Sequence, residues 1–89
     1  MVEIRLELPF AERIGGRESI GVPAGTVESA LRALTDRHPE LIRLIWTDDG
    51  KINPVLALFL NDHLLDLRDI DTEVKSGDQI DIISAVSGG

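Results

Sequence analysis

Few side chains in this 89-residue sequence could do chemistry by themselves. Cysteine is absent, which excludes a disulfide, a thiolate metal site and a cysteine nucleophile. Tyrosine is absent too, and the histidines are His38, just before Pro39, and His63, just after a turn signal. A structural or solvated role explains each histidine better than catalysis does. We therefore expect no catalytic residue on this chain.

The acidic side chains do not form a recognisable metal site. Asp66, Asp69, Asp71 and Glu73 lack the spacing and the central glycine of a calcium loop, so a solvated loop and no metal are expected. Across the chain, 16 acidic against 9 basic residues give a net charge of −7. That charge argues against a nucleic-acid partner and favours partners with basic docking surfaces.

The remaining reactive group is a backbone carboxylate, at the end of Ala85-Val86-Ser87-Gly88-Gly89. Because Gly88 and Gly89 have no side chains, residues 86–89 could enter a narrow channel of another protein as a flexible, extended tail. The Gly89 carboxylate would then reach that protein's active site, where it must be activated before it reacts. A frayed terminus without function is the alternative explanation.

The elements that must position this tail can be predicted from hydrophobic periodicity. Val2–Leu8 alternates apolar and charged residues, which is typical of a strand with one buried side, and Glu18–Val22 completes a hairpin with it. Val55–Asn61 is apolar on both faces, as in a central strand, and a turn leads from it to His63–Leu65. Gln79–Ser84 is the last strand, and the tail follows it directly.

One main helix is predicted between the second and third strands. Thr26 is its expected N-cap, Pro39 stops it, and Arg32 can pair with both Glu28 and Asp36. Its apolar face should pack on inward-facing strand residues; the helix contributes Val27, Ala30, Leu31 and Leu34, and the strands Ile4, Leu6, Leu58, Leu60, Ile80 and Ile82. The order predicts an α+β fold, with a mixed sheet of four to five strands covered on one face by one helix.

The whole chain, residues 1–89, is expected to form a single domain, since it has room for only one small core. The start of the chain alternates charged and apolar residues, unlike a signal peptide, and the longest apolar run, Val55–Leu60, is too short to span a bilayer. We expect a cytoplasmic protein without a membrane partner.

With these features together, the sequence resembles the ThiS/MoaD family of ubiquitin-like sulfur carriers, small β-grasp domains that end in Gly-Gly. Phe59-Leu60-Asn61-Asp62 is similar to the family's strand-to-turn segment, and Lys75-Ser76-Gly77-Asp78-Gln79-Ile80 to its approach to the last strand. Val86-Ser87-Gly88-Gly89 matches the family's ending. Ser84-Ala85 stands where carriers for molybdopterin synthesis often have a proline pair, so the ending is closer to carriers for cysteine or thio-tRNA.

The resemblance implies that a ubiquitin-activating-type enzyme uses ATP to adenylate Gly89. A sulfur donor such as a persulfide enzyme would then convert it to a thiocarboxylate, which a downstream acceptor enzyme uses. No cofactor would be bound to the chain, and the pathway could be of the cysteine, thio-tRNA, thiamine or molybdopterin type. Ser87 and Gly88 would enter a channel of the activating enzyme. Phe59 and Val86, together with an acidic rim, would form the surface by which the domain docks onto that enzyme.

Three other functions fit the same sequence. The chain could be a ubiquitin-like modifier joined to other proteins through Gly89, or the small subunit of a molybdopterin synthase. It could also be an interaction domain in which Gly-Gly is incidental. Similarly, Phe59 could be covered by the region around Trp46, which is predicted to anchor the edge of the core, instead of facing a partner.

Overall fold

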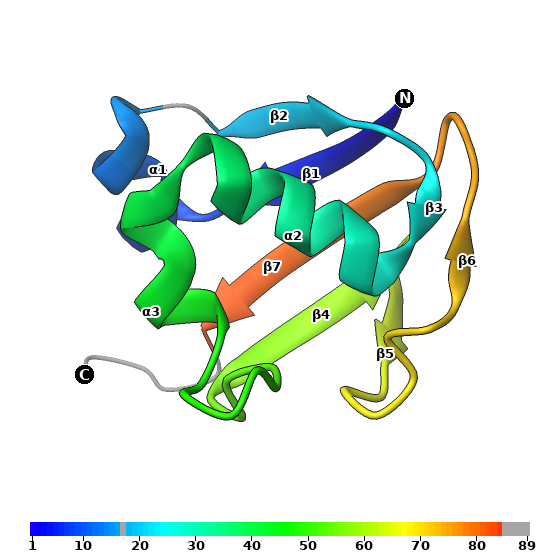
Figure 1. Ribbon diagram of the computed structural model, residues 1–89. Coiled ribbons are helices and arrows are strands. Elements are labelled where there is room, and N and C mark those ends of the chain that lie inside the picture. The colour runs from blue at the N-terminus through cyan, green and yellow to red at the C-terminus, as the bar shows by residue number, and fades with distance from the viewer. Residues whose placement is uncertain (17, 85–89) are drawn as a thin grey trace.

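The computed structural model describes residues 1–16 and 18–84. A five-stranded mixed sheet forms one layer, and helix α2 (Val27–Arg37) crosses one of its faces (Figure 1). The strand order is β2-β1-β7-β4-β5, in which only β1 and β7 pair in parallel. The strands are β1 (Val2–Leu6), β2 (Ser19–Val22), β4 (Leu56–Leu60), β5 (His63–Leu65) and β7 (Gln79–Ser84).

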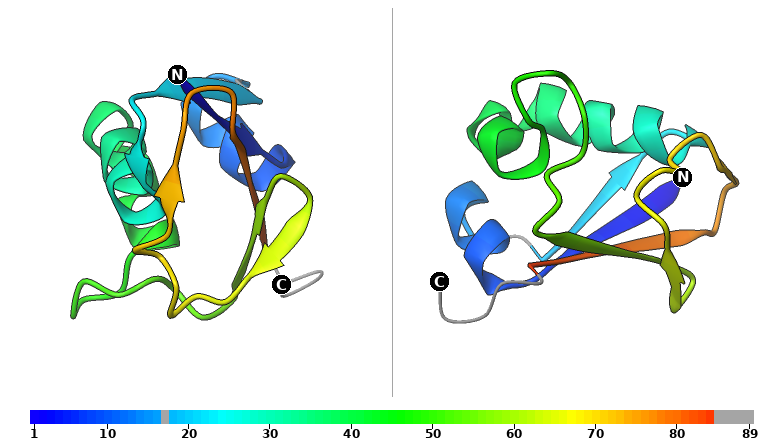
Figure 2. Two further views of the ribbon diagram at one scale, coloured as in Figure 1. Left: turned by 90° about the vertical axis from the view of Figure 1, so that its right-hand side faces the viewer. Right: turned by 90° about the horizontal axis from the view of Figure 1, so that it is seen from below.

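Helix α2 forms where its capping and apolar residues predict. Thr26 is the N-cap, and a capping box joins it to Ser29: the Ser29 N–H donates to Thr26 Oγ1 at 3.1 Å, and the Thr26 N–H donates to Ser29 Oγ at 2.9 Å. His38, before Pro39, closes the other end. The helix buries Val27, Ala30, Leu31 and Leu34 against the sheet, as predicted. Figure 2 shows that helices α2 and α3 (Ile42–Ile45) lie on the same side of the sheet.

The alternation along the strands separates a core face from an outer face. Ile4 of β1, Ile82 of β7 and Leu58 of β4 are fully buried on the α2 side, with Leu6 and Ile80 nearly so. Leu60 also packs against this core but is half-buried. Side chains at the intervening positions therefore point to the opposite face of the sheet.

The segment after β1 corrects the sequence prediction. The strand ends at Leu6 instead of Leu8, and the chain enters a short helix α1 (Leu8–Ala11) and a 3-10 helix η1 (Glu12–Ile14). Phe10, Ala11 and Ile14 are buried there, a helical spacing that continues the core beyond the strand. Gly15 and Gly16, with φ of 76° and 84°, then reverse the chain, and β2 begins at Ser19 rather than Glu18.

Several shorter elements complete the fold. A two-stranded ladder joins β3 (Gly25–Thr26) to β6 (Glu73–Val74), and Glu73 was predicted to lie in a solvated loop. A 3-10 helix η2 (Pro39–Leu41) precedes α3. Strand β4 is shorter than the predicted Val55–Asn61, and the middle position of the sheet belongs to β7.

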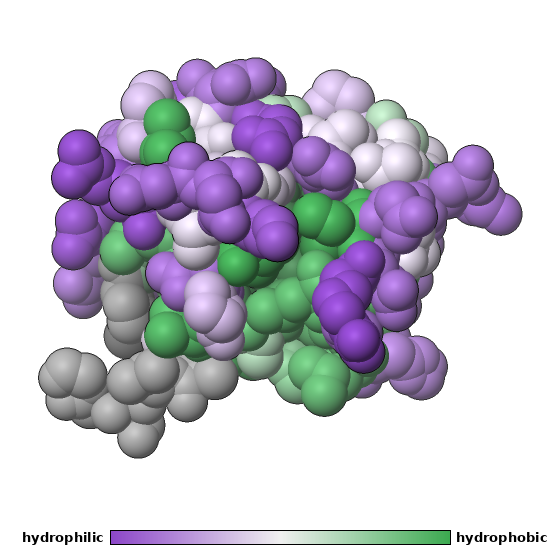
Figure 3. Space-filling view, turned by 60° about the horizontal axis from the view of Figure 1, so that its bottom comes forward, coloured by the Kyte–Doolittle hydropathy of each residue, from purple (hydrophilic) through white to green (hydrophobic). Residues whose placement is uncertain are grey.

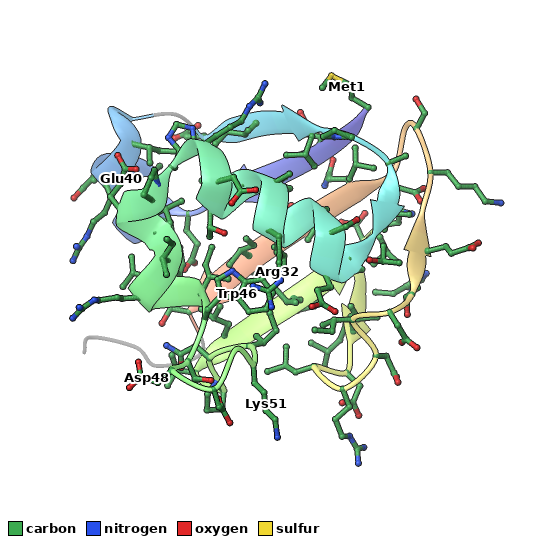
Figure 4. All side chains as sticks on the ribbon, viewed as in Figure 1. Met1, Arg32, Glu40, Trp46, Asp48 and Lys51 are labelled. Carbon is green, nitrogen blue, oxygen red and sulfur yellow. The ribbon has the colours of Figure 1, made fainter. Side chains whose placement is uncertain are left out.

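Arg32 makes one of its two predicted pairs. Its guanidinium contacts Glu28 at 3.3 Å, and it also donates to the Gly50 carbonyl and lies 4.0 Å from the centre of the Trp46 ring. Among the described residues it forms no ion pair with Asp36, because these other contacts engage its side chain. Figure 4 shows Arg32 and Trp46 together beneath α2.

Within residues 1–16 and 18–84, none of the helices is long and apolar enough to cross a membrane.

Candidate functional site

Four of the predicted site residues, Val86, Ser87, Gly88 and Gly89, lie outside the described residues. Their roles in docking, threading and reaction therefore stay predictions. The structure does describe the residue from which this tail starts, Ser84 at the end of β7, and the sheet face beside it. These two features form the candidate site.

Ser84 is held from both sides of its strand. On one side it pairs with Leu56 of β4. On the other, the ladder between β1 and β7 ends at the pair Leu6–Ile82, and the Ser84 N–H donates to Glu7 Oε2 at 2.9 Å. The start of the tail is thus fixed by a backbone partner and by a carboxylate from a residue 77 positions earlier in the chain.

Phe59 lies on the outer face of the sheet, as the alternation predicts. It is paired with Asp81 of β7 on one side and with Leu64 of β5 on the other, while its neighbour Leu58 is buried towards α2. The side chain of Phe59 is half-buried, and Leu64 beside it is 69% exposed. Ala57 and Ile83, paired with each other and both half-buried, continue the apolar part of this face.

The alternative in which Trp46 covers Phe59 is wrong. Trp46 is 7% exposed on the helix side of the sheet, where its Nε1–H donates to Thr35 Oγ1 of α2 at 3.3 Å. Because Phe59 points to the opposite face, the two rings are separated by the sheet. Trp46 instead anchors the edge of the core, as predicted.

Charged residues lie next to the apolar part of the outer face. Arg5 Nε and Asp81 Oδ1 are 3.6 Å apart across β1 and β7, and Glu3 accepts a 2.6 Å hydrogen bond from Ser19 Oγ. A hollow of about 260 Å³ opens at the Ser84 end of these strands, and it is lined by Arg5, Leu6, Glu7, Asp81, Ile82 and Ile83. The face thus combines half-buried apolar side chains with an acidic border, which suits a partner of opposite charge.

The two internal motifs that carry the family resemblance meet at the other end of β7. The Gln79 N–H donates to Asn61 Oδ1 at 2.9 Å, and Asn61 Nδ2 donates to Asp78 Oδ1 at 3.1 Å. Asp78 also accepts from the Lys75 N–H at 2.7 Å, and this bond, followed by that from Asn61, lowers the pKa of the Asp78 carboxyl. Asn61 and Asp62 have φ of 49° and 69°, which a tight hairpin turn requires. These motifs lie at the opposite end of β7 from Ser84.

The histidines and the acidic stretch are not brought together. Among the residues that the structure describes, no three His, Asp or Glu side chains are grouped so that they could hold a metal ion. Asp66 instead pairs with Arg68 at 2.8 Å, and hydrogen bonds from the Arg68 side chain and backbone lower the pKa of Asp66 to about 2.

A second hollow, which the sequence did not suggest, lies on the helix side of the sheet. It has a volume of about 510 Å³ and apolar walls from Ile52, Pro54, Leu67 and Ile70, with Glu28, Gly50, Lys51 and Arg68 also lining it. Figure 3 shows hydrophobic side chains gathered on this face between hydrophilic ones. It is separated from Phe59 by the sheet, so it is no part of the candidate site.

A mixed sheet with parallel first and last strands, crossed by one helix, defines the ubiquitin-like β-grasp class. Within that class, the chain belongs to the ThiS family, whose model matches residues 10–89.

Known proteins of similar sequence and structure agree with this assignment. A relative from Archaeoglobus fulgidus, named "Putative sulfur carrier protein", is 29% identical over 87 residues, which cover 97% of this chain and 98% of the relative. SAMP1 from Haloferax volcanii, a small archaeal modifier protein, has a TM-score of 0.82 at 29% identity, covering 99% of this chain and 98% of that one. The Amycolatopsis orientalis BexX/CysO complex contains a chain with a TM-score of 0.84 at 24% identity and full coverage of both chains, which shows a shared fold.

Proposed function

We propose that this chain is a sulfur carrier whose Gly89 carboxylate is adenylated and then converted to a thiocarboxylate. The observation that carries the proposal is the match to the ThiS family over residues 10–89, a segment that includes Gly88 and Gly89. The absence of cysteine supports it, since no thiol of this chain could carry sulfur. The chain would be a protein co-substrate of its partner enzymes, and ATP would be consumed by the activating enzyme.

The proposed chemistry takes place in two steps. A Gly89 carboxylate oxygen attacks the α-phosphorus of ATP, and pyrophosphate leaves. The resulting acyl-adenylate is a mixed anhydride, from which hydrogen sulfide displaces AMP to leave the thiocarboxylate. When the donor is an enzyme persulfide, its terminal sulfur displaces AMP, and a thiol then cleaves the sulfur–sulfur bond, which releases the thiocarboxylate and forms a disulfide.

Docking to the activating enzyme would use the outer face of the sheet. Phe59 and Val86 would supply apolar contacts, and the acidic border near Asp81 would attract a basic surface. Because attraction between exposed charges is screened by salt, the association rate with the activating enzyme should fall as ionic strength rises. A rate independent of salt would remove the electrostatic part of this proposal.

Reconstitution with the activating enzyme of the source cells tests the chemistry. After incubation with that enzyme, ATP and sulfide, the chain should gain the mass difference between sulfur and oxygen. A chain from which Gly89 has been deleted is the matched control and should gain nothing. A wild-type chain that forms no adenylate would overturn the proposal.

A protein modifier is the second candidate function, favoured by the similarity to SAMP1 at 29% identity. Both functions begin with the same adenylate, so activation alone does not separate them. A tagged chain expressed in its own cells would give adducts of higher mass that resist reducing agents if it is a modifier. Only the free chain and reductant-sensitive species are expected for a carrier.

A further inference from the structure

We propose that the hollow on the helix side of the sheet binds an amphipathic helix of a partner protein, one whose apolar face is bordered by lysine or arginine. This hollow of about 510 Å³, lined by α2 and by the loops 46–55 and 66–72, is called the helix-side groove. Such binding does not depend on the proposed function. Because the groove and Phe59 lie on opposite faces of the sheet, a helix bound in the groove would leave the outer face free.

The helix-side groove has apolar side chains that the fold leaves partly uncovered. Ile52 is 7% exposed, and Pro54 in the same loop is exposed. Leu67 and Ile70, from the other loop, are half-buried and pack against the core. A partner that covers these four side chains removes apolar surface from water, which is the main favourable contribution to most protein association.

The two loops are tied to α2, so the groove has a fixed shape. The Glu28 N–H donates to the Ile70 carbonyl oxygen at 2.8 Å, and Arg32 Nη2 donates to the Gly50 carbonyl oxygen at 3.3 Å. Arg32 also lies over the ring of Trp46, where the first of the two loops begins. Figure 1 shows both loops below α2. A preformed groove loses little conformational entropy on binding, which favours affinity.

The structure around the groove favours a helix over an extended strand as the bound segment. Of the described residues that line the groove, Glu28 belongs to α2 and the others belong to the two loops, so none is in a strand. An extended peptide gains affinity by pairing with a free strand edge, and the groove has none among these residues. A helix bonds its own backbone and needs only apolar side chains that fit the groove.

The border of the groove is acidic. Asp48 and Asp71, one on each loop, are exposed and form no ion pair within residues 1–16 and 18–84. The two loops together contain five acidic and two basic residues and thus have a net charge of −3; these residues are Asp48, Asp49, Asp66, Asp69, Asp71, Lys51 and Arg68. Basic residues of a partner would therefore be attracted on both sides of the groove.

Both basic side chains of the loops are already matched by acidic neighbours. Arg68 donates two hydrogen bonds to the Asp66 carboxylate, at 3.1 and 2.8 Å. A hydrogen bond from Thr47 lowers the pKa of the Asp49 carboxyl, and the positive charge of Lys51 lowers it further. The charge that remains for a partner is thus negative, which is why the helix should be basic at its borders.

The probe for this site is a synthetic peptide of about 20 residues, with leucine at helical spacing on one face and lysine along the borders of that face. A peptide with glutamate in place of each lysine is the control. Each peptide is titrated into the isotope-labelled whole chain and followed by NMR. We expect the lysine peptide to shift the amide signals of Ile52, Leu67 and Ile70 but not that of Leu64 on the outer face. The glutamate peptide should bind about tenfold more weakly.

One pair of variants tests the apolar walls. Leu67→Gln should weaken binding of the lysine peptide about tenfold, because it puts a polar group among the apolar contacts. Leu64→Gln, on the outer face, is the matched control and should leave the affinity unchanged. Unfolding curves check that both variants are folded.

A second pair of variants tests the acidic border without touching the core. Asp48→Lys combined with Asp71→Lys should weaken binding of the lysine peptide about tenfold. Glu12→Lys combined with Glu40→Lys changes the net charge of the chain by the same amount, also at exposed positions, and should weaken binding much less.

Four results would overturn the proposal. Amide shifts confined to Phe59 and Leu64 would assign the peptide to the outer face, and a lysine peptide that shifts no amide would show that the groove is not a docking site. Equal binding of the lysine and glutamate peptides would exclude a basic partner. Shifts of the groove amides that depend on protein concentration without peptide would make the groove an interface between two copies of this chain. Since none of these measurements uses the activating enzyme, their failure would leave the proposed function standing.

Discussion

The two ends of strand β7 are built differently. At Gln79, side-chain and backbone bonds join the strand to Asn61, and Asp78 beside it is bound by both Asn61 and Lys75. At Ser84, the strand pairs with Leu56, and its N–H donates to a carboxylate from a distant part of the chain, that of Glu7. The Gln79 end is tied to a tight hairpin turn, and the Ser84 end leads to the residues where the proposed chemistry takes place. Substitutions at the two ends should therefore have separable effects on stability and on activation.

The largest expected effect is loss of activation in Gly88→Val. A β-branched side chain should not fit a channel shaped for glycine, and misplacement of the reacting group can lower a rate by about a hundredfold. Adenylate formation should fall by at least this factor, while the free energy of unfolding stays unchanged.

Gly21→Val is the matched control for this substitution. Gly21 lies in edge strand β2, where the three atoms nearest to an added Cβ all belong to the flexible Met1 side chain, at 3.4 Å or more. This variant should be activated normally. Normal adenylation of Gly88→Val by the same enzyme would contradict the threading of the tail.

Asn61→Ala should produce the opposite result at the Gln79 end of β7. It removes the side-chain bonds to Gln79 and Asp78, and it places alanine at a φ of 49°. Together these changes should cost about 2 kcal/mol in denaturant unfolding. Asn61→Gly, which tolerates that φ, should recover about 1 kcal/mol. Both variants should be activated normally where they are folded; a lowered kcat would mean that the ends of β7 are not independent.

Phe59→Ala tests the outer face of the sheet. If Phe59 anchors the partner, its truncation should weaken binding to the activating enzyme by at least tenfold, with little loss of stability. Titration calorimetry and unfolding curves measure the two quantities, and Leu64→Ala, the exposed neighbour, shows the effect of losing a peripheral contact. A large loss of stability with unchanged affinity would assign Phe59 to the core instead.

The smallest effect concerns a pair remote from both ends. Asp66 has a pKa lowered to about 2 from its ordinary value of 3.8, first by the Arg68 side chain and then by the Arg68 backbone. Its contribution to stability is therefore present above pH 3.8 and is lost as the pH falls through about 2. Arg68→Ala should raise the Asp66 pKa towards its ordinary value, as measured by NMR of the carboxyl carbon. An unchanged pKa would show that the pair does not form in solution.

The sequence was sufficient for the elements with clear periodicity. The apolar spacing of α2 and the alternation of β1 and β7 predicted both the layers and the face on which Phe59 lies. Helix α1 was missed because alternation continues through Leu8, although the spacing of Phe10, Ala11 and Ile14 is helical. The β3–β6 ladder was missed because strands of two residues have no detectable period.

The candidate site was predicted less completely. The tail residues and Phe59 could be named from sequence, since motif and alternation identify them. Glu7 could not, although alternation does place it on the outer face of the sheet. Its contact with Ser84 depends on where β1 ends and on the parallel pairing of strands far apart in the chain, which only the tertiary structure provides.

The central claim, that sulfur is carried on Gly89, is tested most directly by the intact mass of the chain purified from its own cells. The account predicts a species heavier by the difference between sulfur and oxygen, which an alkylating reagent modifies once, because the chain has no cysteine thiol to compete. Fragmentation should locate that mass at Gly89. A chain with only its unmodified mass, in cells that are actively making sulfur-containing metabolites, would contradict the account.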